Sequence, residues 1–117
     1  MSEVKTVQAG ELNQRIQILR TVVSEPDPEG YREREEELVL GCWAKVSFVS
    51  GTEMVKANAD FGEVKARFLI RYPSVPIGRK MTVRYRGREY AVTYVNDYAG
   101  KKYLEIWGTW QSREGNG

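Results

Sequence analysis

The sequence contains no histidine and only one cysteine, Cys42. The lack of histidine excludes imidazole general bases, the common Ser-His-Asp and Cys-His constellations, and zinc sites that need nitrogen ligands. A single cysteine cannot form an intrachain disulfide or a multi-thiolate metal site. With no histidine to activate it, Cys42 is interpreted as a small core residue and not as a nucleophile. We therefore predict no catalytic residue, no metal and no cofactor, and hence a protein that is not an enzyme.

Long hydrophobic runs are also lacking. The longest uncharged apolar stretch, Leu38–Ala44, is far too short for a membrane span, and the first twenty residues have no apolar core of signal-peptide type. The glycines stand singly at predicted turns, so the glycine patterns of dinucleotide-binding and P-loop proteins are not present. We expect a protein that is cytoplasmic where it is made and has no membrane partner.

The chain of 117 residues, of which 41% are hydrophobic, has the size and composition of one folded domain. We expect a flexible N-terminal segment at residues 1–9, a single domain at 10–110 and a flexible tail at 111–117. The net charge of +2 conceals an uneven distribution, because residues 1–40 carry 9 acidic and 5 basic side chains whereas residues 65–117 carry 4 and 11. Such polarity suits either nucleic-acid binding by the basic part or the stacking of copies, acidic surface on basic surface.

Six short strands are predicted, because apolar residues alternate with polar ones at the two-residue period of half-buried β-structure. Turn-forming residues separate them, as at Ser24–Gly30 and at the two-residue turn Arg86-Gly87. The charged run Arg32–Glu37 is interpreted as an exposed loop or strand edge. The expected strands are 12–22, 38–49, 66–72, 81–85, 89–95 and 102–110. The sequence thus predicts an all-β fold, a small antiparallel β-barrel of about six strands.

A long connection separates the second and third predicted strands. Ser50 and Glu53 form a capping box, and Met54, Ala57 and Phe61 follow at helical spacing, which favours a short helix or a long loop. Loops beyond about 12–15 residues within a compact domain tend to be functional or disordered. We therefore interpret this insertion as the candidate functional element. It comprises Ser50, Gly51, Thr52, Glu53, Met54, Val55, Lys56, Ala57, Asn58, Ala59, Asp60, Phe61, Gly62, Glu63, Val64 and Lys65.

The basic second half keeps a nucleic-acid hypothesis open. Single-strand-binding barrels combine cationic side chains with aromatic faces on which bases stack. Strands with arginine on a solvated face and tyrosine at a barrel rim show the same mixture without any ligand. Nucleic-acid binding and an ordinary barrel surface therefore both remain open as hypotheses. The residues concerned are Arg67, Arg71, Arg79, Lys80, Arg84, Arg86, Arg88, Lys101, Lys102, Tyr72, Tyr85, Tyr90, Tyr94, Tyr98 and Tyr103.

Taken in order, the motifs of the chain resemble those of the phage head-tail joining proteins, also called head closure or stopper proteins, of tailed phages and prophages. The resemblance extends over about Gly10–Trp110. It is carried by a turn ending at Gly30 and by Gly10-x-Leu12-x-x-Arg15-Ile16-x-Ile18, Cys42-Trp43-Ala44-Lys45-Val46, Gly51-x-Glu53, Phe68-x-Ile70-Arg71-Tyr72 and Tyr85-x-Gly87-x-x-Tyr90-x-Val92. The acidic run Arg32–Glu37 is richer than is usual in that family.

The resemblance implies a virion component that forms a ring beneath the portal protein and its adaptor, at the head-tail junction. The ring would close the DNA exit channel after packaging, contact double-stranded DNA non-specifically through the insertion, and present a docking face to tail proteins. A ring needs two complementary flanks on each copy, and the charge polarity can supply them. The candidate subunit-contact charges are Glu35, Glu36, Glu37, Arg79, Arg86 and Arg88.

The resemblance also implies assembly in the cytoplasm of the bacterial host, from copies that are monomers in isolation. One alternative is a tail-completion or terminator ring protein, which a complex would distinguish. The other is a barrel that binds single-stranded nucleic acid, for which tight and steeply salt-dependent oligonucleotide binding would be the evidence.

Overall fold

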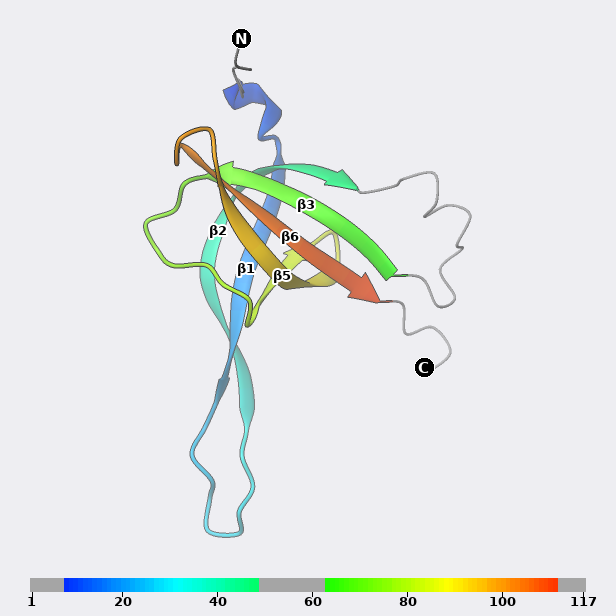
Figure 1. Cartoon of the computed structure of the whole chain (residues 1–117). Coiled ribbons are helices and arrows are strands. Elements are labelled where there is room, and N and C mark those ends of the chain that lie inside the picture. Colours follow the sequence, from blue (N-terminus) through cyan, green and yellow to red (C-terminus); the bar gives the residue numbers. More distant parts are fainter. Residues whose placement is uncertain (1–7, 49–62, 112–117) are drawn as a thin grey trace.

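The computed structural model describes residues 8–48 and 63–111. Six antiparallel strands form one sheet that closes on itself in the order β1-β2-β3-β6-β5-β4, with β4 pairing back to β1 (Figure 1). The elements are the 3-10 turn η1 (Ala9–Glu11) and the strands β1 (Gln14–Val23), β2 (Arg34–Phe48), β3 (Glu63–Arg71), β4 (Met81–Tyr85), β5 (Arg88–Tyr98) and β6 (Tyr103–Gln111). The predicted all-β, six-stranded antiparallel fold is confirmed.

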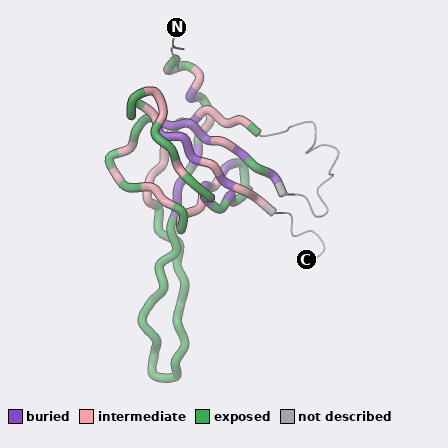
Figure 2. Tube along the Cα trace, viewed as in Figure 1, coloured by how far each residue is buried: buried purple, intermediate pink, exposed green. Residues whose placement is uncertain are grey.

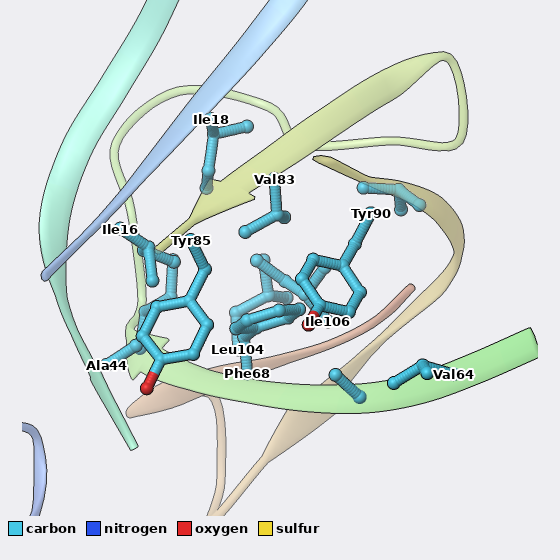
Figure 3. Close-up of a cluster of buried hydrophobic side chains, with 13 residues drawn as sticks. Ile16, Ile18, Ala44, Val64, Phe68, Val83, Tyr85, Tyr90, Leu104 and Ile106 are labelled. Carbon is cyan, nitrogen blue, oxygen red and sulfur yellow. The ribbon is translucent and has the colours of Figure 1, made fainter. Parts of the chain in front are cut away.

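The barrel interior is filled by the apolar members of the alternating pattern (Figure 3). Phe68 lies near its centre and contacts Tyr85 and Tyr90 edge to face, with ring centroids 6.1 and 5.3 Å apart. Such aromatic pairs add to the stabilisation that burial itself provides. The buried cluster is Ile16, Ile18, Ala44, Val64, Ala66, Phe68, Ile70, Val83, Tyr85, Tyr90, Val92, Leu104 and Ile106.

The lack of a side chain at Gly108 allows β5 and β6 to pack closely. A Cβ atom at Gly108 would lie 3.0 Å from Cβ of Tyr90 and 3.2 Å from the backbone oxygen of Ala91, both tighter than ordinary van der Waals contact. A glycine inside a strand often marks such a close approach. Tyr90 can therefore pass over β6 and reach Phe68 because position 108 has no side chain.

β1 and β2 continue beyond the barrel as a two-stranded ribbon, residues 20–37, which we call the arm (Figures 1 and 2). Ile18 pairs with Leu40 but Leu19 pairs with Leu38, so Val39 is an extra residue in β2 at the point where the arm leaves the barrel. Such a β-bulge bends the strand and increases its twist. Every residue of the arm is exposed.

One predicted boundary, the start of the third strand at residue 66, is wrong. β3 begins at Glu63, so Glu63, Val64 and Lys65 lie in a strand and not in the insertion, and Val64 is only 6% exposed within the core. Val64 points inward like Ala66, but its charged neighbours made the strand pattern hard to recognise in the sequence. The predicted capping-box helix lies in residues 49–62, outside the described residues. The charged segment 34–37 is a strand, in agreement with the strand-edge interpretation of the run.

Candidate functional site

The connection between β2 and β3 leaves and re-enters the barrel at one end, which we call the connection end. β2 ends at Phe48, which pairs with Ala66 of β3, and Val64 at the start of β3 pairs with Trp110 near the end of β6. The β4–β5 turn lies at the same end, because Arg88 just after it stacks on the Trp110 ring at 4.2 Å. The two residues that frame the segment 49–62, Phe48 and Glu63, thus lie on adjacent paired strands at this end of the barrel.

Two of the predicted contact charges, Arg86 and Arg88, meet at the connection end. They line a pocket of about 310 Å³ together with Phe48, Tyr85 and Tyr90. Arg86 takes a positive φ of 53° ahead of Gly87 at 79°, as a tight two-residue hairpin turn requires. This turn aims the Arg86 side chain back over the barrel end.

Ring and amide contacts hold both guanidinium groups. Arg86 lies 5.3 Å from the centroid of the Tyr85 ring and donates to Oε1 of Gln14 at 3.3 Å. Arg88 rests on Trp110 by a cation–π contact. Among the described residues neither guanidinium is paired with a carboxylate. The connection end therefore presents two positive charges that are positioned but not neutralised.

The predicted acidic contact residues divide into two kinds. Glu36 accepts from Nη2 of Arg84 at 2.5 Å, and Glu37 accepts from Nε of Arg20 at 2.5 Å, so both are neutralised within their own chain. Arg84 also donates to Glu89 at 2.7 Å, and its hydrogen bonds to Glu89 and Glu36 raise the pKa of the Arg84 guanidinium. Glu35 is exposed and has no ion pair among the described residues. The pair Glu36–Arg84 thus ties the arm to β4.

The remaining predicted contact residue, Arg79, is exposed just before β4 begins, whereas Arg86 and Arg88 follow the other end of β4. Ser50–Gly62 of the predicted insertion lie outside the described residues. The other three residues of the predicted insertion, Glu63, Val64 and Lys65, belong to β3.

A second pocket, which sequence reasoning did not single out, lies on the barrel flank. It has a volume of about 460 Å³, and we call it the flank groove. The Arg15 guanidinium lies 5.5 Å from the Trp43 ring centroid. Burial raises the pKa of the Cys42 thiol to about 11, although the positive charge of Arg15 acts to lower it. A thiol with that pKa is not a nucleophile at neutral pH. The lining residues are Leu12, Arg15, Leu40, Gly41, Cys42, Trp43, Arg71, Tyr72 and Pro73.

The tyrosine and arginine set of the nucleic-acid hypothesis does not form one stacking surface. Tyr85 and Tyr90 are buried in the core, and Tyr94 is stacked on Trp107 with ring centroids 6.1 Å apart. Arg67 and Arg84 are bound to carboxylates of their own chain. The structure therefore disperses the aromatic and cationic groups that a single-strand-binding face needs together.

Two negative observations apply to residues 8–48 and 63–111. No cluster of three or more acidic or cysteine side chains is placed to hold a metal ion. No helix in this part of the chain is long and apolar enough to cross a bilayer.

The described residues form a closed β-barrel with a projecting acidic arm and a basic end. Residues 7–108 match the phage head completion protein family, and the chain belongs to that family. It is thus a structural component of the phage virion, and the family indicates a non-enzymatic role. No curated protein matches the chain.

Solved structures share the fold. The solution structure of protein SF1141 from Shigella flexneri 2a is 23% identical, with a TM-score of 0.63, and the match covers 92% of this chain and 99% of that one. A chain in the virion of a native gene transfer agent particle is 19% identical, with a TM-score of 0.61, over 86% of this chain and 94% of that one.

Proposed function

We propose that copies of this protein form a ring at the head-tail junction that closes the DNA exit channel after packaging and offers a docking face to the tail. The observation that carries this proposal is the family match over residues 7–108. The portal protein or its adaptor would bind one face of the ring and tail proteins the other. Assembly would take place in the cytoplasm of the bacterial host.

In this proposal the barrel is the scaffold and residues 49–62 are the part that obstructs DNA. This proposal is supported by the connection end, where Phe48 and Glu63 lie on the paired strands β2 and β3. The segment between these two residues is therefore anchored to the barrel at both ends. Arg86 and Arg88 beside this base supply non-specific attraction for phosphate. Obstruction would be steric, because a channel that must later release DNA cannot hold it tightly.

The test is replacement of residues 52–61 by a short glycine and serine turn, which leaves Phe48 and Val64 in their strands. We expect a folded protein that still enters particles, but heads that leak DNA or fail to gain tails. The matched control keeps the length of the segment and changes its sequence to glycine and serine, which separates reach from composition.

DNA retention in purified heads, tail attachment by electron microscopy and infectivity are the readouts. Fully infectious, DNA-filled particles from the shortened variant would refute the proposal. Heads that retain DNA and carry tails of abnormal structure would instead favour the terminator ring.

A further inference from the structure

The end of the arm, residues 24–33, which we call the tip, is a pre-ordered loop. Asp27 is at its centre: its Oδ1 accepts from the backbone N–H groups of Glu29 at 3.0 Å and Tyr31 at 2.8 Å. The Asp27 N–H donates to the Tyr31 carbonyl at 2.8 Å. At the base of the loop, the N–H of Ser24 donates to the Glu33 carbonyl, and the Glu33 N–H donates to the Ser24 hydroxyl, both at 2.9 Å.

This ordering presents an aromatic side chain to solvent. Tyr31 is 73% exposed, although its own backbone is fixed by two hydrogen bonds with Asp27, one through its N–H and one through its carbonyl. The same loop carries the exposed side chains of Glu25, Glu29 and Glu33, which have no ion pairs among the described residues. A tyrosine whose backbone is ordered before binding loses less entropy on contact than one in a flexible loop, and tyrosine is over-represented among residues that dominate interface energies.

The arm has too little support of its own to be a free-standing element. A two-stranded ribbon is at best marginally stable in water. Val22 and Val23 are each more than two-fifths exposed along it, as is Leu38 next to it. The arm contacts β4 through Arg20 and Glu36, and beyond these contacts Figure 2 shows it extending away from the barrel. A partner surface that covers the arm would bury these side chains.

The flank groove has the properties that such a tip would need. Its apolar lining includes Trp43, 54% exposed, and Tyr72, 44% exposed. Its two cationic side chains, Arg15 and Arg71, have no ion pair among the described residues. Arginine beside an aromatic surface is suited to bind carboxylates and a phenol ring together.

The tip cannot occupy the groove of its own chain. Gly30 precedes Leu40 of the groove by ten residues, which lie in the tip and in β2 from Arg34 onward. At about 3.3 Å per residue the tip is therefore up to about 30 Å from the groove along the extended arm (Figure 1). This length of the arm lies between the two shorter dimensions of the molecule, 22 and 38 Å, so the arm can extend across the flank of an adjacent copy.

We propose that the tip of one copy docks into the flank groove of the next, with Tyr31 against Trp43 and the tip carboxylates toward Arg15 and Arg71. Tip and groove are different surfaces, so each copy gives one contact and receives one. A heterologous contact of this kind generates rings when its rotation closes. The inference rests on the proposed ring, and it names the contact that would hold the ring together.

The test uses assembled particles in which Tyr31 is replaced by the photo-crosslinking residue benzoylphenylalanine. On irradiation we expect a ladder of covalent multimers of this chain, with the crosslinked peptides mapping to residues 40–43 or 71–73. Arg71→Glu in the same background should lower the crosslink yield about tenfold, whereas Lys80→Glu, an exposed charge change outside the groove, should leave it unchanged.

The outcomes separate the contact from the function. Crosslinks to another virion protein, crosslinks to a different part of this chain, or no crosslinks in particles that contain the protein would overturn the docking contact while leaving the head-tail assignment intact. Absence of the chain from finished particles would instead refute the proposed function.

Discussion

The ion pair between Arg67 of β3 and Glu105 of β6 allows the sharpest test of the barrel. Nε of Arg67 donates to Oε2 of Glu105, and the two side chains are only 19% and 11% exposed. Asn96 donates to the other carboxylate oxygen at 3.3 Å, and the guanidinium lies 5.1 Å from the Tyr98 ring centroid. The pair therefore joins three neighbouring strands on the outside of the sheet.

Opposing effects set the pKa of the Glu105 carboxyl. Desolvation raises it, but the hydrogen bonds from Arg67 and Asn96, the nearby Trp107 indole and the Arg67 charge together lower it below its usual value of 4.5. The Trp107 N–H faces this carboxylate without reaching normal hydrogen-bond geometry. Because the folded-state pKa is depressed, the group stabilises the fold fully above about pH 4.5, and this contribution is lost as pH falls through the folded-state pKa.

The perturbation is Arg67→Met, which leaves the Glu105 carboxylate shielded from water without its main partner. Breaking a buried pair in this way costs about 3–5 kcal/mol, and because some solvent reaches both side chains we expect about 3 kcal/mol at pH 7. For a domain of this size such a loss lowers Tm by about 10–20 °C. The variant should lose less relative to wild type at pH 4, where protonation of Glu105 removes the unpaired charge.

Urea unfolding at pH 7 and pH 4 measures both effects. The control is the double variant Arg67→Met with Glu105→Leu, which removes both charges and should recover most of the stability. The reasoning is refuted if the single variant unfolds within about 0.5 kcal/mol of wild type at pH 7, the spread of an ordinary surface substitution. It is also refuted if the difference does not shrink at pH 4.

Two further predictions concern the core and the thiol. Gly108→Ala should lower the free energy of unfolding in urea by about 1–3 kcal/mol, because its Cβ would meet Tyr90 and Ala91. Gly78→Ala, which has open space around its Cβ, should stay within about 0.5 kcal/mol, and equal losses in both variants would contradict the packing argument. Cys42 should react with iodoacetamide at pH 8 far more slowly than a free thiol, because its pKa is about 11, and urea should restore the rate.

Much of the barrel follows from local alternation. Ile16, Ile18 and Val83 point inward as the two-residue period predicts, and the β4–β5 hairpin forms at the expected Arg86-Gly87 turn. Leu69 shows where alternation is insufficient. It belongs to the outward row of β3, yet it is 1% exposed, because part of the outer face is covered as well as the inner one. Such coverage depends on tertiary contacts that no short pattern contains.

The candidate sites were less predictable than the fold. The charges at Arg86 and Arg88 were evident in the sequence, but their meeting at the connection end depends on the closure of the barrel. The arm required knowledge of register, since Arg20 meets Glu37 only after a bulge shifts β2 by one residue. The flank groove combines β1, β2 and the end of β3, so no single segment could indicate it.

The charged run has a physical role even though Glu36 and Glu37 are neutralised within the chain. β2 pairs with β3 only from Ala44 onward, so along the arm its outer edge has no partner strand among the described residues. An open edge of this length invites strand addition by any other chain, and charged side chains along it oppose such pairing. Glu35, which has no ion pair among the described residues, keeps that opposition, while the Arg20–Glu37 pair joins the two strands of the arm and the Glu36–Arg84 pair joins the arm to β4. The charged side chains thus oppose edge pairing along the arm, and the contact that we propose is left to the tip. There the ordered loop presents Tyr31, the one aromatic side chain of residues 20–37.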